Sequence, residues 1–254
     1  MKVKNTKVLM PAISVAVLAL GGGYYGLQLV NNQNNLPKAL AYTSTINPVD
    51  PSTAPDSYEI KFTDNNFKRA LNSVLMKTNT SRNLDSPITV GDAKKLTDFN
   101  PDGPYRNFEN FEGIQYFTNL ETIHVHGIGE LKDISAAAAL TKIRTAYLSS
   151  SSISDMSATK NWKQVGLIWI HDNHVIDFSF LKDLPHAGVW GIRSNVKIKA
   201  QKGQRILKNP FINFDGTIMP IKENENFINV DVNGNPKQDG GYVKIIKIWK
   251  TICH

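Results

Sequence analysis

A tripeptide of the form Asp-apolar-Ser occurs three times in this chain of 254 residues, beginning at Asp133, Asp155 and Asp177. Each copy starts 22 residues after the previous one. A fixed period of this length is typical of a protein built from stacked structural repeats, in which each repeat contacts mainly its neighbours. The period therefore constrains the fold more than any other feature of the sequence.

Apolar residues recur at the same places within each period. Counted from Ile134, they stand 3, 6, 9, 12, 14 and 19 residues further along the chain, and the same steps from Met156 meet one polar exception, Thr159. The steps of two indicate a short strand, whereas the steps of three indicate a turn of helix or 3-10 helix. The predicted strands cover residues 123–125, 146–148, 168–170 and 190–192. In each of them the first and third residues should face the core and the middle residue should face outward.

A small polar residue follows three of the predicted strands at the bend of the coil. These residues are Ser151, Asn173 and Asn195. An inward side chain there can bond backbone groups of neighbouring coils that would otherwise be buried without partners. The whole pattern predicts a leucine-rich repeat, which is an α/β solenoid of about four 22-residue coils.

The spacing and the Asp-apolar-Ser signature resemble the 22-residue repeats of internalin-type surface proteins of Gram-positive bacteria. Residues 67–75 and 88–99 resemble the helical N-terminal cap of that family as it runs into the first strand. Residues 209–217 resemble the start of the immunoglobulin-like module that follows the repeats. The resemblance spans about residues 58–250 and implies a solenoid between a helical cap and a short C-terminal β-sandwich-like module.

The first 57 residues have a different composition. Residues 1–41 are predicted to be a signal peptide or a membrane anchor, because lysines precede an uncharged stretch over 8–30. A small-residue cleavage pattern stands at 39–41. Residues 42–57 are rich in Thr, Ser, Asn and Pro, so they are predicted to form a disordered linker.

The rest of the chain divides into three parts. Residues 58–98 form the predicted helical cap, in which Thr89 and Asp92 are spaced as in a capping box. Residues 99–198 hold the repeats. Residues 199–254 alternate as an antiparallel β module does, and this immunoglobulin-like module is either minimal or truncated, because such a sandwich usually needs about 100 residues.

The net charge of +7 is unevenly distributed. Residues 1–41 hold four lysines and no acidic residue, and residues 197–254 hold ten lysines and arginines against five acidic residues. A solvated basic face of the C-terminal module is the simplest reading, and contact with anionic wall polymers is the alternative. Because the basic residues are scattered, binding of nucleic acid is not expected. The single cysteine, Cys253, excludes an internal disulfide.

Outward strand positions of successive coils lie about 4.8 Å apart and therefore form columns on the concave face. The predicted columns are Asn100, His124, Tyr147, Trp169 and Gly191; His126, Ser149, His171 and Arg193; and Gly127, Ser150, Asp172 and Ser194. Exposed aromatic and arginine side chains on a rigid surface are typical of binding hot spots. The predicted ligand-binding residues are His124, His126, Tyr147, Trp169, His171 and Arg193. The alternative is that these aromatic rings only shield the strand backbone.

A metal site and an enzyme active site are less well supported. His124 and His126 share one face of a strand, but His171 is two coils away, about 10 Å along the stack, which is wide for one zinc ion. No cofactor or metal is therefore predicted. The common hydrolase and nucleotide-binding motifs do not occur in the sequence, and the serines at 149–152 beside His171 and Asp172 lack the signs of a catalytic triad.

The preferred function is that of an exported binding protein, either secreted or displayed on the surface of a Gram-positive bacterium. The family resemblance implies adhesion and virulence, through recognition of a host-cell or bacterial protein or glycan. The alternative is a membrane-anchored envelope protein that binds a bacterial partner. The chain is expected to be monomeric, to meet the membrane only through its N-terminal segment, and to lack enzymatic activity. The identity of the ligand is not encoded in any recognisable motif.

Overall fold

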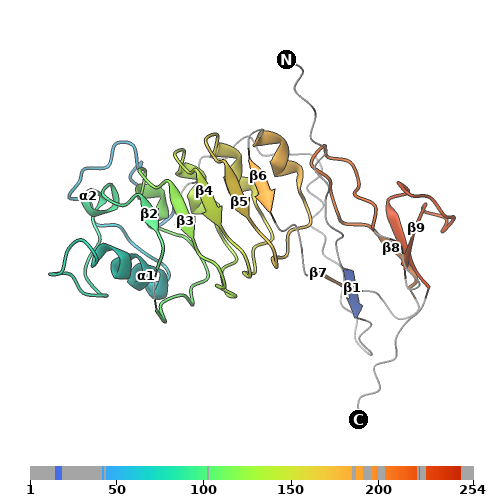
Figure 1. Ribbon diagram of the computed structural model, residues 1–254, viewed down its shortest axis with the longest axis horizontal. Helices are drawn as coiled ribbons and strands as arrows, with labels where there is room; N and C mark the ends of the chain where they lie inside the picture. The colour runs from blue at the N-terminus through green and yellow to red at the C-terminus, as the bar shows by residue number, and fades with distance from the viewer. Residues whose placement is uncertain are drawn as a thin grey trace, which may run out of the picture.

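The computed structural model describes residues 15–18, 42, 44–101, 103–184, 187–190, 196–199, 204–221, 223 and 227–246. Its centre is a parallel sheet of five strands in the order β2-β3-β4-β5-β6, as Figure 1 shows. The strands are β2 (Asp98–Phe99), β3 (Thr122–His124), β4 (Thr145–Tyr147), β5 (Leu167–Trp169) and β6 (Gly188–Trp190). Spatial order follows chain order, so each strand begins a new coil of a solenoid. The predicted repeat architecture is confirmed.

A 3-10 helix follows each of the strands β3 to β5 on the return path of the coil, and another precedes β3. These segments are η1 (Ile114–Tyr116), η2 (Ser135–Ala139), η3 (Ser157–Asn161) and η4 (Ser179–Asp183). The Asp-apolar-Ser signature lies at the start of the last three of them. In each copy the aspartate Oδ1 accepts a hydrogen bond of 2.7 to 2.8 Å from the backbone N–H of the serine two residues later. The signature is therefore a local turn that starts the return segment.

One continuous apolar core runs through the stack. It begins at Ala54, ends at Leu184 and includes the inward strand residues Ile123, Ala146 and Ile168, each of which is fully buried. Asn173 lies in this core as predicted, since its side chain accepts from Ile153 N and donates to the carbonyl oxygens of Leu148 and Ile170. The amide thus satisfies backbone groups on two neighbouring coils. Ser151 is also buried, whereas Asn195 lies outside the described residues.

Two helices, α1 (Asn65–Leu75) and α2 (Val90–Ala93), lie before the first strand of the sheet (Figure 1). The side chain of Asp64 caps α1 by accepting from the N–H groups of Asn66 and Phe67. Thr89 and Asp92 form the predicted capping box at the start of α2. The buried faces of both helices belong to the core of the repeats.

Residues 42–57 were expected to be a disordered linker, and this expectation is wrong for the part that the structure describes. Ala54 is buried, and Ser44 and Asn47 donate hydrogen bonds of 2.7 Å to the carboxylate of Glu112. Tyr42 also donates to Glu112 through its hydroxyl group. The polar side chains whose composition suggested disorder instead form hydrogen bonds with the first coil.

The C-terminal part contains an antiparallel sheet of three strands in the order β8-β10-β9, formed by β8 (Ile206–Lys208), β10 (Tyr242–Ile245) and β9 (Phe227–Val230). A second, small core of Phe211, Ile221 and Val243 lies under it. Ile212 joins the last coil through hydrogen bonds between its own backbone and that of Ile176 and Phe178. In the part of the chain that the structure describes, a small antiparallel sheet thus follows the last coil (Figure 1).

Within residues 1–41 the structure describes only β1 (Val15–Leu18), which pairs in parallel with β7 (Val196–Lys199). The predicted cleavage pattern at 39–41 and Cys253 lie outside the described residues. Among the helices that the structure describes, none has the length and apolar character required to cross a membrane.

Candidate functional site

The outward strand residues form the predicted columns on the sheet. His124 is paired with Tyr147 and Tyr147 with Trp169 in the register of the parallel strands. Their chain neighbours Ile123, Ala146 and Ile168 are buried, so alternation turns the three ring side chains away from the core. Trp169 is 36% exposed, and His126 is exposed as well.

The rings in these columns contact one another in sequence. His124 stacks on Tyr147 with ring centroids 4.6 Å apart, Tyr147 lies 5.8 Å from Trp169, and Trp169 lies 6.0 Å from His171. His171 in turn lies 5.7 Å from His126, which completes a path across three strands. We call these five side chains the ring row. Five of the six predicted site residues therefore lie together in one continuous surface feature.

The two histidines of the second column meet across the coil that lies between them. His126 and His171 follow β3 and β5, and Ser149 stands between them after β4. Backbone hydrogen bonds from Gly127 N to Ser149 O and from Ser150 N to His171 O hold the three segments side by side. Ser149 is only 1% exposed, and it follows the strand that lies between those that lead to the two histidines. The ring of His171 is also held by Asp172, with 2.9 Å between Nδ1 and Oδ2.

The residues of the third column that the structure describes have a left-handed backbone conformation, and the chain turns at them after each strand. This conformation was not predicted from the sequence. Gly127, Ser150 and Asp172 have φ angles of 76°, 54° and 58°. Residues other than glycine rarely adopt this conformation, and the short polar side chain of aspartate tolerates it better than most. The signal was available in the sequence, because glycine, serine and aspartate occupy equivalent places in successive coils.

The last strand differs from its predicted register. A 22-residue step from Ile168 and Trp169 predicts Trp190 as an inward residue and Gly191 as the outward one. In the structure Val189 pairs with Ile168 and Trp190 with Trp169, so the coil is one residue shorter than the period. The backbone position beside Trp169 therefore belongs to Trp190, and the assignment of Gly191 to this column is wrong. Arg193, the sixth predicted site residue, lies outside the described residues.

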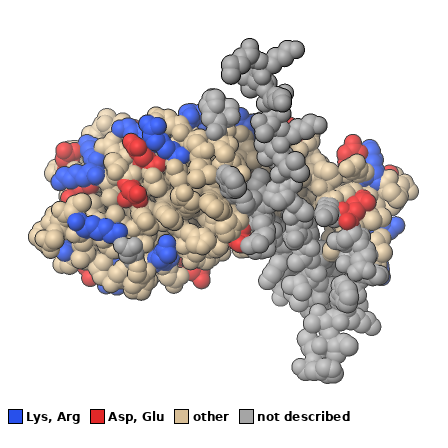
Figure 2. Space-filling view, in the orientation of Figure 1, with Lys and Arg blue, Asp and Glu red and all other residues tan. Residues whose placement is uncertain are grey.

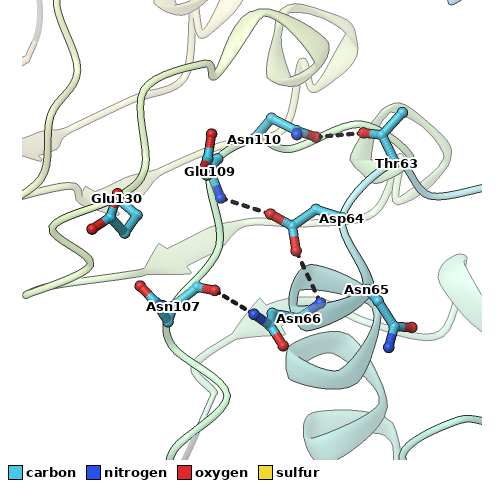
Figure 3. A pocket seen from close by; sticks show the side chains of 8 residues that line it. All are labelled: Thr63, Asp64, Asn65, Asn66, Asn107, Glu109, Asn110 and Glu130. Carbon is cyan, nitrogen blue, oxygen red and sulfur yellow. Dashed lines mark hydrogen bonds between the residues drawn. The ribbon is translucent and has the colours of Figure 1, made fainter.

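A polar pocket of about 430 Å³ lies at the other end of the solenoid, where α1 begins (Figure 3). It is lined by Thr63, Asp64, Asn65, Asn66, Asn107, Glu109, Asn110 and Glu130. The hydrogen bonds drawn in Figure 3 are internal ones, since Asp64 accepts from Glu109 N and from Asn66 N, and Asn66 donates to Asn107 O. The carboxylate of Asp64 is thus occupied in fastening the start of α1 to the neighbouring loop.

Charged side chains on the face seen in Figure 2 are mixed in sign and scattered over the solenoid. No large basic patch is visible on this face. Among the residues that the structure describes, no group of three or more His, Cys, Asp and Glu side chains is arranged to hold a metal ion. The ring row is consequently the most distinctive feature of the described surface.

Comparisons with known proteins complete this picture. No protein-family model matches the sequence, and the search of curated proteins finds no match. Internalins are among the solved structures to which the chain is similar, as the repeats predict. An internalin (InlF) from Listeria monocytogenes is 19% identical, with 55% of this chain and 52% of that chain covered and a TM-score of 0.33. The functional domain of InlJ from Listeria monocytogenes is 11% identical, with coverages of 59% and 32% and a TM-score of 0.45.

A third similar structure contains the CBM51-2 and INT domains of ZmpB from Clostridium perfringens in complex with GlcNAc. It is 15% identical, with 77% of this chain and 32% of that chain covered and a TM-score of 0.31. The chain thus spans about half of the InlF chain and about a third of each of the other two. The solenoid itself is established by the stacked coils described above.

Proposed function

We propose that this chain is a binding module of an exported protein, secreted or displayed on the cell surface, and that the ring row is its contact with a protein or glycan ligand. The observation that carries the proposal is the continuous path of five outward rings on a sheet whose opposite side is fully packed. Rings held in place by their neighbours lose little conformational entropy on binding, and they offer large contact areas with polar edges.

The ring row suits either kind of ligand for a physical reason. Tyrosine and tryptophan present apolar faces, whereas the histidines beside them provide nitrogen atoms that donate or accept hydrogen bonds. Adhesion to a host-cell or bacterial surface is the role that we infer for such a face on an exported solenoid. An envelope protein that binds a bacterial partner would use the same face, so the two alternatives differ in the partner and not in the site.

The central experiment measures binding of the full chain to fractions of host-cell surface and of bacterial envelope. The variants Tyr147→Ala and Trp169→Ala each remove one ring from the middle of the row. Each should weaken binding by about 2 kcal/mol, which is about thirtyfold, if these rings anchor the ligand. The fraction that binds the unaltered chain distinguishes a host ligand from a bacterial one.

A matched control is provided by Phe214, which is 47% exposed, follows the last coil and is not part of the ring row. Phe214→Ala removes an exposed ring of similar size, and we expect it to leave the affinity unchanged. Thermal unfolding of all three variants establishes that the solenoid remains folded. Equal affinity of the unaltered chain and both ring-row variants would show that the ligand binds elsewhere.

Export is supported by the lysines and the uncharged stretch within residues 1–41. The small-residue pattern at 39–41 ends immediately before Tyr42, and Tyr42 is the first residue of the segment that contacts Glu112. Cleavage after Ala41 would therefore leave that contact intact. N-terminal sequencing of the protein from the culture medium and from the cell envelope distinguishes a chain that begins at Tyr42 from one that retains Met1.

A further inference from the structure

The pair formed by His126 and His171 is unusual because the two residues follow strands that are not neighbours. Strands two places apart in a sheet are separated by about 10 Å. The ring centroids nevertheless lie only 5.7 Å apart, so both side chains lean toward each other across the intervening coil. The residue at the equivalent place on that coil is Ser149, whose small side chain leaves the space above it to the two rings.

The separation of the rings matches what a shared metal ion requires. A zinc ion lies 2.0–2.1 Å from a histidine nitrogen, which places it about 3.2 Å from the centre of the imidazole ring. Two imidazoles at a tetrahedral angle then have centroids about 5.2 Å apart, and a modest widening of that angle gives the observed 5.7 Å. The two rings are inclined by 60° to each other at this separation, so they are close enough for one nitrogen of each to reach a common ion.

Asp172 adds a second feature that is common beside metal-bound histidines. Its Oδ2 lies 2.9 Å from Nδ1 of His171. A carboxylate at this place favours the tautomer in which Nδ1 carries the proton, and it leaves the lone pair on Nε2 for a metal. The backbone of Asp172 is in the left-handed conformation, with a φ angle of 58°. This conformation sets the direction in which the side chain leaves the backbone.

We propose that His126 and His171 form a two-histidine site on the outward face of the sheet for a divalent transition metal, with Zn²⁺ as the ion and Asp172 as the residue that orients His171. Imidazole is a preferred ligand of zinc and copper. With two protein ligands, two of the four tetrahedral positions of the ion stay open to water or to a ligand group.

The test is calorimetric titration of the untagged full chain with ZnCl₂. One ion per chain is expected to bind the unaltered protein, and His126→Ala and His171→Ala should each abolish saturable binding. Asp172→Asn should weaken binding by about 10- to 100-fold, because it keeps the size of the side chain but loses its charge. His174→Ala is the matched control, since His174 is exposed and is not part of the ring row, and it should bind as the unaltered chain does.

A second measurement uses a copper ion as the probe. Trp169 lies 6.0 Å from His171, so Cu²⁺ held by the pair should quench the fluorescence of this tryptophan. The quenching should saturate in the unaltered chain and in His174→Ala, and it should be lost in His171→Ala. Thermal unfolding without metal verifies that the variants are folded. Absence of saturable Zn²⁺ binding by the unaltered chain, or equal binding by the His126 and His171 variants, would overturn the proposal.

Discussion

Asn173 shows how much a single side chain contributes to a stack of coils. Its amide makes hydrogen bonds of 2.7 to 3.1 Å with three backbone groups, those of Leu148, Ile153 and Ile170, and it is fully buried. A truncated side chain at this place leaves one N–H and two carbonyl groups without partners in the core. Because each such group costs about 1–3 kcal/mol, Asn173→Ala should lower the free energy of unfolding by at least ~3 kcal/mol.

Urea denaturation measures this loss, and Asn161 offers the control. Asn161 is a partly buried asparagine on the return segment, and its side chain makes one hydrogen bond, of 2.8 Å, to Ala138 O. Asn161→Ala should therefore cost only about 1 kcal/mol. If both variants lost the same stability, the bend asparagine would have no special role in joining the coils.

Ser150 occupies a backbone conformation that suits glycine better. Its φ angle is 54°, and the equivalent place in the preceding coil is held by Gly127 with a φ angle of 76°. A left-handed conformation destabilises the folded state by about 1–2 kcal/mol for a residue with a Cβ atom, and glycine avoids this strain. Glycine also makes the unfolded chain more flexible, which lowers the free energy of unfolding by about 0.5–1 kcal/mol and offsets part of the gain. Ser150→Gly should therefore raise the free energy of unfolding by up to about 1.5 kcal/mol.

The comparison variant for this position is Ser150→Ala, which removes the hydroxyl group but keeps the Cβ atom. Thermal or urea unfolding of the two variants separates the backbone effect from the loss of the hydroxyl. A gain in stability is expected for the glycine variant alone. An equal gain in both variants would attribute it to the hydroxyl group and contradict the argument from the backbone.

Among the elements, the segment 44–57 shows where composition misleads. Its prolines and small polar residues resemble a linker, yet its polar groups have partners that are distant in sequence. Glu112 is only 8% exposed and accepts hydrogen bonds from Tyr42, Ser44 and Asn47, all of them neutral donors, as well as from Gln115. Nothing in the local composition indicates such an acceptor, because it lies some 65 residues further along the chain.

The environment of Glu112 makes the stability of the protein depend on pH. Burial raises the pKa of the Glu112 carboxyl, the nearby Asp133 adds to this rise, and the hydrogen bond from Gln115 opposes it. A carboxyl whose pKa is higher in the folded state contributes stability that is fully present below its unfolded value, about 4.3, and this contribution is lost as the pH rises through the folded pKa. Relative to Glu112→Gln, the unaltered chain should therefore become less stable as the pH increases from about 4 to about 7.

Urea denaturation at several pH values gives the difference in free energy of unfolding between the two chains. Glu109→Gln is the control, because Glu109 is exposed and its ion pair with Lys132, at 3.3 Å, lies in solvent. It should show little pH-dependent difference, since exposed pairs contribute little. A difference in the free energy of unfolding between the unaltered chain and Glu112→Gln that stays constant over this range of pH would contradict a raised pKa of Glu112.

The strands and the ring row show how far the sequence can be taken. The period located the strands β3 to β5 and the outward positions of Tyr147 and Trp169, because alternation along a strand follows directly from backbone geometry. It failed at β6, where the coil is one residue shorter and a slip of one residue exchanges inward and outward places. The contact between the rings of His126 and His171 could not be predicted from the sequence either, because it depends on the side-chain conformations of the two histidines and not on strand spacing.

For the whole molecule, the single core from Ala54 to Leu184 implies that the first coil depends on what covers it. In a solenoid each coil is stabilised mainly by its neighbours, so the end of the stack needs a covering segment. Residues 42–57 provide part of that cover, both through the donors to Glu112 and through Val49, whose carbonyl accepts a hydrogen bond of 2.6 Å from the hydroxyl of the buried Tyr116.

A chain that begins at Tyr58 should consequently be less stable than a chain that begins at Tyr42, even though both keep the two helices and all the coils. The shorter chain leaves Glu112 and Tyr116 without the partners supplied by residues 42–57, and at about 1–3 kcal/mol for each buried group the loss should reach at least ~3 kcal/mol. Urea denaturation at pH 7 compares the two chains, and Glu112→Gln in the shorter chain should recover part of the loss because it removes the stranded charge. Equal stability of the two chains would mean that the first coil is covered by the helices alone.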